Sequence, residues 1–294
     1  MRWVALSATG RLAQVELTTP MNTARANLVP TRVDHDVLMS WTAAEDGYVG
    51  AVSSRGTAYR LGLSDLPTLA PSGPWSLWDG PLAHDLLSAS DDEHIIGLYS
   101  LGLDAPPLAL GTRRGTVKRV VPEYKGWDSW QVMSVKDDDE IVGSNAAADG
   151  DDLVVITTDA QLLRLSAREV RPQGRSAGGM AGIKLAEGAE VIFFGAITKD
   201  ERDGAIVATL AVGADSPATV KTTAFDQYPT KGRATGGVRT HRFLKGQHHL
   251  TLAWAGLPPV RACDAQGAPR NLPSCDDRRD GTGSKVYGPF YALG

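Results

Sequence analysis

The chain has 294 residues, 42% of them hydrophobic, with 32 glycines and 17 prolines, which is typical of many short strands and turns around a sizeable core. No run of about 18 apolar residues occurs, which excludes an ordinary transmembrane helix, and the two cysteines, Cys263 and Cys275, exclude a disulfide framework. The formal net charge of −4 excludes a uniformly basic surface. The apolar run after Arg2 breaks at Ser7, so no signal peptide is expected.

A recurring pattern starts near the N-terminus: an apolar strand, a tight turn, and a second strand with a basic residue just after its midpoint. The copies lie at residues 5–15, 50–61, 108–120 and 154–165, with a degenerate copy at 218–228. Gly10, Gly56 and Gly115 occupy the turn, where glycine adopts a positive φ without steric cost, and Ala160 takes that place in the fourth copy. Each copy is followed by another short apolar run, bounded by polar residues, that predicts a third strand.

Together these strands predict five full units and part of a sixth, all in one domain spanning residues 1–294. The units lie at about residues 3–43, 48–101, 107–147, 152–197 and 205–256, with the partial sixth at 258–294. One short helix is expected at residues 82–88, inside a Pro- and Trp-rich insertion at residues 67–91.

Residues 172–196 are repeated in register at residues 230–254. The matching pairs are Gly174/Gly232, Arg175/Arg233, Gly178/Gly236, Gly179/Gly237, Lys184/Arg242 and Gly188/Gly246. A period near 50 residues built from strands predicts an all-β, propeller-like radial array, because each unit alone exposes an apolar face that only a neighbour can cover.

Charge is divided unevenly along the chain. Residues 1–106 hold 6 basic and 12 acidic side chains, whereas residues 107–256 hold 19 basic and 18 acidic ones. In the second part, acidic residues gather in hairpin turns such as 137–140 and 149–152. Basic residues recur just after the glycine turn, at Arg60, Lys118, Arg119, Arg164 and Lys221. They also recur in the glycine-rich loops, at Arg168, Arg171, Arg175, Lys184, Lys231, Arg233, Arg239, Arg242 and Lys245.

Radial symmetry would place these basic positions on one part of the rim, as a curved stripe that matches the phosphates of a bent DNA duplex. Glycine beside an arginine allows the backbone to approach a phosphate, which fixes position without reading sequence. All these basic residues are therefore candidate DNA contacts.

Other readings of the same residues remain open. The glycine-rich loops are also compatible with plain turns, and the basic positions with solvated strand residues. Trp75, Trp78, Trp127 and Trp130 suit either base stacking or core packing. The histidines show no metal-ligand spacing, and nucleotide-binding and hydrolase motifs are absent, so neither a metal nor a cofactor is expected. The rival function is a propeller-like protein–protein interaction scaffold that uses the acidic first third or the Trp-rich insertion.

The strand pattern Gly115, Val117, Lys118, Arg119 followed by Tyr124 resembles the repeating signature of the C-terminal domain of bacterial type IIA topoisomerase A subunits, the gyrase A and topoisomerase IV A family. Residues 170–185 and 227–238 are similar to two further blades of that domain. The resemblance covers about residues 4–256.

This resemblance implies a β-pinwheel of five to six four-stranded blades, with strands exchanged between blades and a basic rim that binds and bends double-stranded DNA without sequence preference. It implies a cytoplasmic, nucleoid-associated domain that guides the transported duplex, and its implied partners are the breakage–reunion core and the ATPase B subunit. Cleavage in such enzymes belongs to a tyrosine in an upstream winged-helix region. Because the chain begins at the first blade, it is expected to be non-catalytic on its own.

The chain departs from gyrase at one motif. Gyrase carries a box resembling Gln-Arg-Arg-Gly-Gly-Lys-Gly associated with the first blade, but residues 17–33 contain no glycine here. The similar run from Gln173 to Gly179 lies in the fourth unit and lacks the second arginine and the lysine. The topoisomerase IV type, or a gyrase paralogue with weak wrapping, is therefore favoured.

Overall fold

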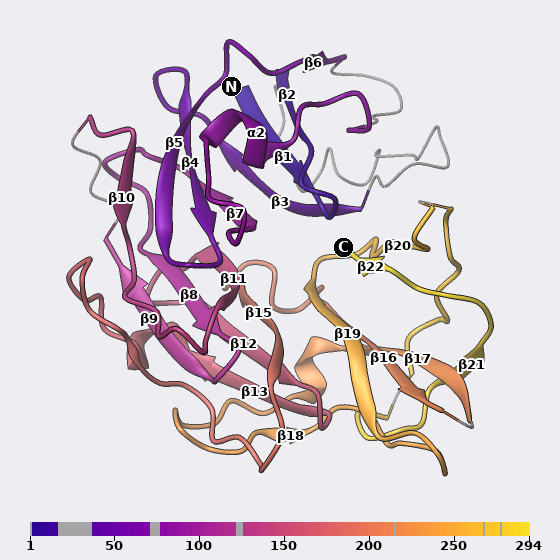
Figure 1. Cartoon of the computed structure of the whole chain (residues 1–294). Coiled ribbons are helices and arrows are strands. Elements are labelled where there is room, and N and C mark those ends of the chain that lie inside the picture. Colours follow the sequence, from indigo (N-terminus) through magenta and orange to yellow (C-terminus); the bar gives the residue numbers. More distant parts are fainter. Residues whose placement is uncertain are drawn as a thin grey trace.

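The computed structural model describes residues 2–16, 37–70, 77–121, 126–214, 216–266, 268–276 and 278–294. These residues form five four-stranded sheets arranged as the blades of a propeller-like ring (Figure 1). The predicted all-β radial architecture is confirmed. The short helix expected from the sequence is present as α2 (Ala83–Leu87). No helix among the described residues is long and apolar enough to cross a membrane.

Each sequence unit supplies three antiparallel strands to one blade, and the third of these strands lies innermost. Blade 1 contains β1 (Arg2–Ser7), β2 (Leu12–Glu16) and β3 (Leu38–Ala43). Blade 2 contains β4 (Tyr48–Ser53), β5 (Thr57–Gly62) and β7 (Ile95–Tyr99). Blade 3 contains β8 (Leu108–Thr112), β9 (Thr116–Val120) and β11 (Ile141–Ala146). Blade 4 contains β12 (Asp152–Thr157), β13 (Gln161–Ser166) and β15 (Val191–Ile197). Blade 5 contains β16 (Ile206–Gly213), β17 (Ser216–Ala224) and β19 (His249–Gly256).

The fourth, outermost strand of each blade comes from a later part of the chain. Its members are β6 (Thr68–Leu69), β10 (Ser129–Gln131), β14 (Met180–Ala181), β18 (Val238–Arg239) and β21 (Ser284–Val286) for blades 1 to 5. Only β6 pairs parallel to its neighbour, while the other four pair antiparallel. Strand exchange of the pinwheel kind is therefore present, and it ties each blade to the unit that follows.

The glycine turns adopt the predicted backbone conformation. Gly10, Gly56 and Gly115 have φ of 81°, 83° and 83°, and Ala160 takes the same left-handed conformation at φ 62°. Glycine is required at Gly56 for a second reason, because a Cβ there would lie 2.3 Å from the carbonyl oxygen of Met133. The tight turn therefore lets the exchanged chain pass directly over it.

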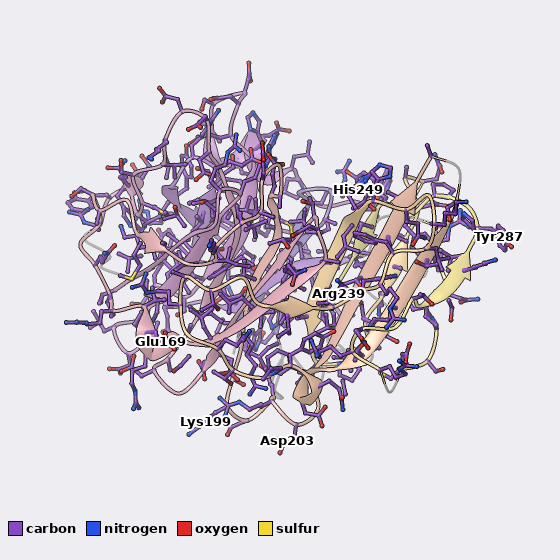
Figure 2. The ribbon with its side chains drawn as sticks, turned by 90° about the horizontal axis from the view of Figure 1, so that it is seen from below. Glu169, Lys199, Asp203, Arg239, His249 and Tyr287 are labelled. Carbon is purple, nitrogen blue, oxygen red and sulfur yellow. The ribbon has the colours of Figure 1, made fainter. Side chains whose placement is uncertain are left out.

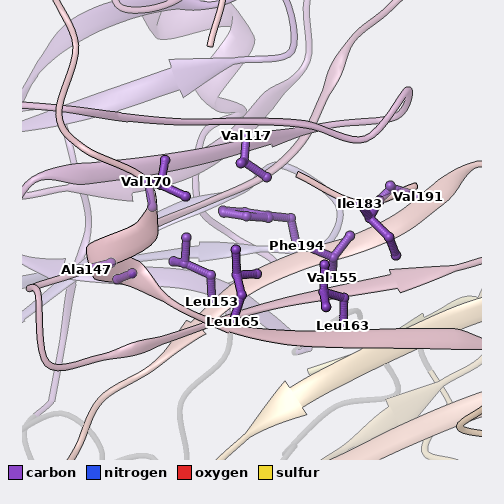
Figure 3. Packing of buried hydrophobic residues seen from close by; sticks show 12 residues of the cluster. Val117, Ala147, Leu153, Val155, Leu163, Leu165, Val170, Ile183, Val191 and Phe194 are labelled. Carbon is purple, nitrogen blue, oxygen red and sulfur yellow. The ribbon is translucent and has the colours of Figure 1, made fainter. Parts of the chain in front are cut away.

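Most of the hydrophobic core lies between neighbouring blades, and one further cluster packs on blade 1 itself. Between blades 3 and 4, Phe194 and Leu163 pack with Val117 and Ala109 from the adjacent sheet (Figure 3). Equivalent buried clusters join blades 1 and 2, blades 2 and 3, and blades 4 and 5. Each unit thus covers the apolar face of its neighbour, as the repeat predicted.

Residues 258–294 do not form a sixth four-stranded blade among the described residues. They supply β21 to blade 5 and form a two-stranded sheet of β20 (Ala262–Cys263) and β22 (Ala292–Leu293). Cys263 and Ala292 pack against Val37 and Ala8 of the first unit. The two ends of the ring therefore meet through the tail (Figure 1).

Candidate nucleic-acid interface

The basic positions after the glycine turn serve a structural role that the sequence did not reveal. Lys118 on β9 is fully buried, and its Nζ donates hydrogen bonds to the carbonyl oxygens of Val132, Arg175 and Ala177 at 2.7, 2.8 and 2.8 Å. Lys221 on β17 is equally buried and donates to the Thr223 hydroxyl and, at 3.3 Å, to the Arg278 carbonyl. Burial lowers the pKa of both lysines to about 8. Each lysine anchors the backbone of an exchanged strand.

Arg119 and Arg164 each donate to a backbone carbonyl of the unit that follows in the chain. The Arg119 guanidinium is 1% exposed and donates to the carbonyl of Ala167 at 2.8 Å and to Asp149 at 2.8 Å. The Arg164 side chain is 11% exposed, bonds Asp152 and the Tyr228 carbonyl, and lies 4.5 Å from the Phe225 ring centroid.

The prediction that these positions contact DNA is therefore wrong for Lys118, Arg119 and Lys221, whose side chains are at most 1% exposed. Arg164 is committed to an ion pair and is mostly covered. Arg60 is more open, with 27% of its side chain exposed, but it is paired with Asp128 and stacks on Tyr48. The physical reason is common to Lys118, Arg119, Arg164 and Lys221: carbonyl oxygens of the following unit lie against the blade here and need hydrogen-bond donors.

The glycine-rich loops lie on the outer edge of the ring, as predicted from the repeat. We call the segments that carry β10, β14, β18 and β21 the exchange segments, comprising residues 128–134, 173–184, 231–242 and 276–288. In the edge-on view of Figure 2, Arg239 and Tyr287 lie at mid-height, between His249 on one flat side and Lys199 and Asp203 on the other. The exchange segments therefore form the rim rather than a flat side.

The remaining predicted contacts are exposed or half-exposed on or beside this rim. Exposed side chains are those of Arg168, Arg171, Lys184, Lys231, Arg239, Arg242 and Lys245, and half-exposed ones are those of Arg175 and Arg233. Arg168 and Arg171 precede the exchange segment of blade 3, at and just after the short 3-10 helix η1 (Ala167–Glu169). All the others lie in the exchange segments of blades 3 and 4, except Lys245, which follows the second of them.

These two exchange segments lie in acid-free stretches of the chain. Residues 170–186 contain Arg171, Arg175 and Lys184 but no aspartate or glutamate, and residues 227–247 contain five basic residues and no acidic one. The Arg233 guanidinium donates to the Ala181 carbonyl, so it bridges the two segments along the rim. We call the exposed basic side chains on the edges of blades 3 and 4 the basic band. Two carboxylates adjoin it, since Glu169 accepts from the backbone N–H of Arg233 and Asp280 pairs with Arg242.

Two of the tryptophans that were candidates for base stacking instead make cation–π contacts with arginines. The Arg175 guanidinium carbon lies 4.4 Å from the ring centroid of Trp127, and Arg11 lies 4.9 Å from that of Trp78. Trp130 is 7% exposed and belongs to the core between blades 2 and 3. Trp75 lies outside the described residues.

Sequence reasoning missed the basic residues of the tail. Arg278 and Lys285 are exposed and Arg279 is half-exposed in the exchange segment of blade 5. The signal was present in the sequence, since Arg278 is followed by Gly281 and Gly283 much as Arg175 is followed by Gly178 and Gly179. The stretch from the arginine to the second glycine is one residue longer in the tail, so the tail segment does not align in register with the other two.

Comparisons with known proteins agree with this architecture. The family model "DNA gyrase C-terminal domain, beta-propeller" matches residues 151–198 and 218–248, which contain the exchange segments of blades 3 and 4. The DNA gyrase A protein of Mycobacterium tuberculosis (strain ATCC 25618 / H37Rv) is 28% identical over 226 residues, which is 74% of this chain and 24% of that protein. The predicted family resemblance is confirmed. The chain is similar to the C-terminal domains of type IIA topoisomerase A subunits, and it spans about a quarter of the length of the curated relatives it matches.

Solved structures show the same pinwheel fold. The C-terminal domain of DNA topoisomerase IV aligns with a TM-score of 0.75 at 19% identity, covering 99% of this chain and 92% of that one. The DNA gyrase A C-terminal domain aligns with a TM-score of 0.64 at 15% identity, covering 97% of this chain and 94% of the other. The pinwheel connection where gyrase carries its box, residues 17–33, falls outside the described residues.

Proposed function

We propose that this chain is a DNA-binding and DNA-bending domain of a type IIA topoisomerase, which guides the transported duplex along its rim. The observation that supports the proposal is the set of exposed basic side chains on the edges of blades 3 and 4, whose exchange segments contain no aspartate or glutamate. Arginine and lysine at spaced positions on a curved edge suit phosphates of a bent duplex, and bending a short duplex costs on the order of a few kcal/mol.

In this proposal the contacts belong to the exposed loop residues and not to the buried strand residues. Arg168, Arg171, Arg175, Lys184, Lys231, Arg233, Arg239 and Arg242 bind phosphates. Lys118, Arg119, Arg164 and Lys221 hold the backbone that presents them. Sequence-independent binding follows, because phosphate contacts fix position without reading bases.

The domain performs no cleavage and no ATP hydrolysis in this proposal. It acts in the cytoplasm together with a breakage–reunion core and an ATPase partner. The topoisomerase IV type, or a weakly wrapping gyrase paralogue, remains favoured because residues 17–33 contain no glycine.

The test is equilibrium binding of the chain to a duplex of some tens of base pairs at rising salt. The variant Arg171→Glu/Lys184→Glu/Arg239→Glu changes three exposed side chains, and Lys199→Glu on a flat side is the control. Each lost phosphate contact makes the slope of log K against log salt shallower by about 0.9, so the loss of three contacts should make it shallower by about 2.7.

Unchanged binding by the triple variant would overturn the rim assignment. A wild-type protein that does not retain DNA, but binds a protein partner without salt dependence, would favour the scaffold function instead.

A further inference from the structure

The tail carries a third copy of the segment that presents the basic band. Gln173 donates its backbone N–H to the Arg119 carbonyl at 2.8 Å, and Lys231 donates to the Arg164 carbonyl at 2.8 Å. At the equivalent place on blade 5, Asp276 donates to the Thr222 carbonyl at 2.7 Å. Three segments of different sequence thus start with the same contact to the second strand of a blade.

The three segments also make the same turn. Gly179, Gly237 and Gly283 are all left-handed, with φ of 86°, 72° and 68°. A Cβ at these positions would lie 2.7, 2.5 and 2.6 Å from a carbonyl oxygen of the second strand of the blade. Between these two fixed points, Lys118 bonds the carbonyl of Arg175 and Lys221 bonds the carbonyl of Arg278. Arg278 is therefore the structural counterpart of Arg175.

Backbone hydrogen bonds join the exchange segments into one belt along the rim. Ala234 donates to Gly182 at 2.6 Å between blades 4 and 3, and Arg242 donates to Gly281 at 2.9 Å between blades 4 and 5. Side chains repeat the link, because Arg279 donates to the Arg239 carbonyl at 3.2 Å as Arg233 does to that of Ala181. The basic band therefore continues physically onto blade 5.

Two acidic residues of the tail segment, Asp276 and Asp280, accept hydrogen bonds from neighbouring residues. The Asp280 carboxylate accepts from Arg242 at 3.2 Å, and the Asp276 carboxylate accepts from the backbone N–H of Arg278 at 2.8 Å. The side chains of Arg278 and Lys285 are exposed.

We infer that residues 278–288 form a third contact with duplex DNA, in which Arg278 and Lys285 bind backbone phosphates at the edge of blade 5. This inference rests on the proposed function, and it extends the DNA path from two blade edges to three. It assigns to the tail a binding role in addition to its part in closing the ring.

The test compares the wild-type chain with Arg278→Ala/Lys285→Ala, in salt-dependent binding and in hydroxyl-radical footprinting of a long duplex. The control is Lys199→Ala, an exposed lysine on a flat side (Figure 2). Loss of two phosphate contacts should make the salt slope shallower by about 1.8, so between 50 and 200 mM salt the wild type should lose roughly tenfold more affinity than the variant. The footprint should also shorten at one end only.

The outcomes separate the two proposals. If the wild type and Lys199→Ala bind alike, and the double variant keeps the wild-type slope and footprint, the third contact is overturned while the proposed function stands. If the wild type itself does not bind duplex DNA, the proposed function falls and the third contact falls with it. Thermal unfolding of the double variant should match the wild type, because both substituted side chains are exposed.

Discussion

Replacing Lys118 by methionine tests whether the buried lysines anchor the rim. The substitution removes three hydrogen bonds from a charged donor, each worth about 1.5–3 kcal/mol, or roughly 6 kcal/mol in total. It also relieves the cost of burying the ammonium, which lowers the pKa from 10.5 to about 8 and corresponds to about 3 kcal/mol. The net expected loss in the free energy of unfolding is therefore about 3 kcal/mol.

Urea unfolding at pH 7, where the buried ammonium is still mostly protonated, measures this loss. Lys184→Met is the matched control, because Lys184 is exposed on the same exchange segment and its replacement should change stability by less than about 0.5 kcal/mol. If Lys118→Met retained wild-type stability and lost only DNA affinity, Lys118 would be a DNA contact and the anchoring role would be refuted.

Three further predictions concern the turns, the buried histidine and the core between blades. An alanine in the left-handed conformation costs roughly 1–2 kcal/mol of the free energy of unfolding, and Gly47→Ala, whose Cβ would have nothing within 4 Å, should cost only that amount. Gly56→Ala should cost clearly more in denaturant unfolding, because its Cβ would lie 2.3 Å from the Met133 carbonyl oxygen. Burial lowers the pKa of His241 from 6.5 to about 4, so the unfolded state binds more protons between these values. This histidine should make the free energy of unfolding fall by about 3 kcal/mol as pH drops from 6.5 to 4, and His241→Asn should remove that part of the pH dependence in pH-resolved unfolding. Phe194→Ala should destabilise the chain by about 3–5 kcal/mol by calorimetry, and a loss below about 1 kcal/mol would contradict its placement between blades 3 and 4.

The repeat, the order of strands and the turn conformation could be predicted because they depend on local chemistry. A glycine between two short apolar runs marks a positive φ, and Gly10, Gly56 and Gly115 adopt it. The in-register copies of Arg175 and Arg233 also predicted where the exposed basic loops lie, since equivalent positions of a radial repeat occupy the same edge.

The role of Lys118 and Arg119 could not be predicted, because their acceptors are distant in sequence. The carbonyls bonded by Lys118 lie as far as 59 residues downstream, so a basic residue on a strand gave no local sign of burial. The tail was missed for a similar reason. The stretch from Asp276 to Gly283 is one residue longer than the equivalent stretches from Gln173 to Gly179 and from Lys231 to Gly237. Aspartates also lie among its basic residues, so the sequence alone did not show a basic segment.

Amide hydrogen exchange with and without duplex DNA tests most directly whether the exchange segments of blades 3, 4 and 5 form the DNA path. DNA should slow exchange in residues 173–184, 231–242 and 278–288, and leave the amides of residues 37–70 and 77–106 unchanged. Protection confined to those N-terminal residues, or to the flat side that carries Lys199, would contradict the account.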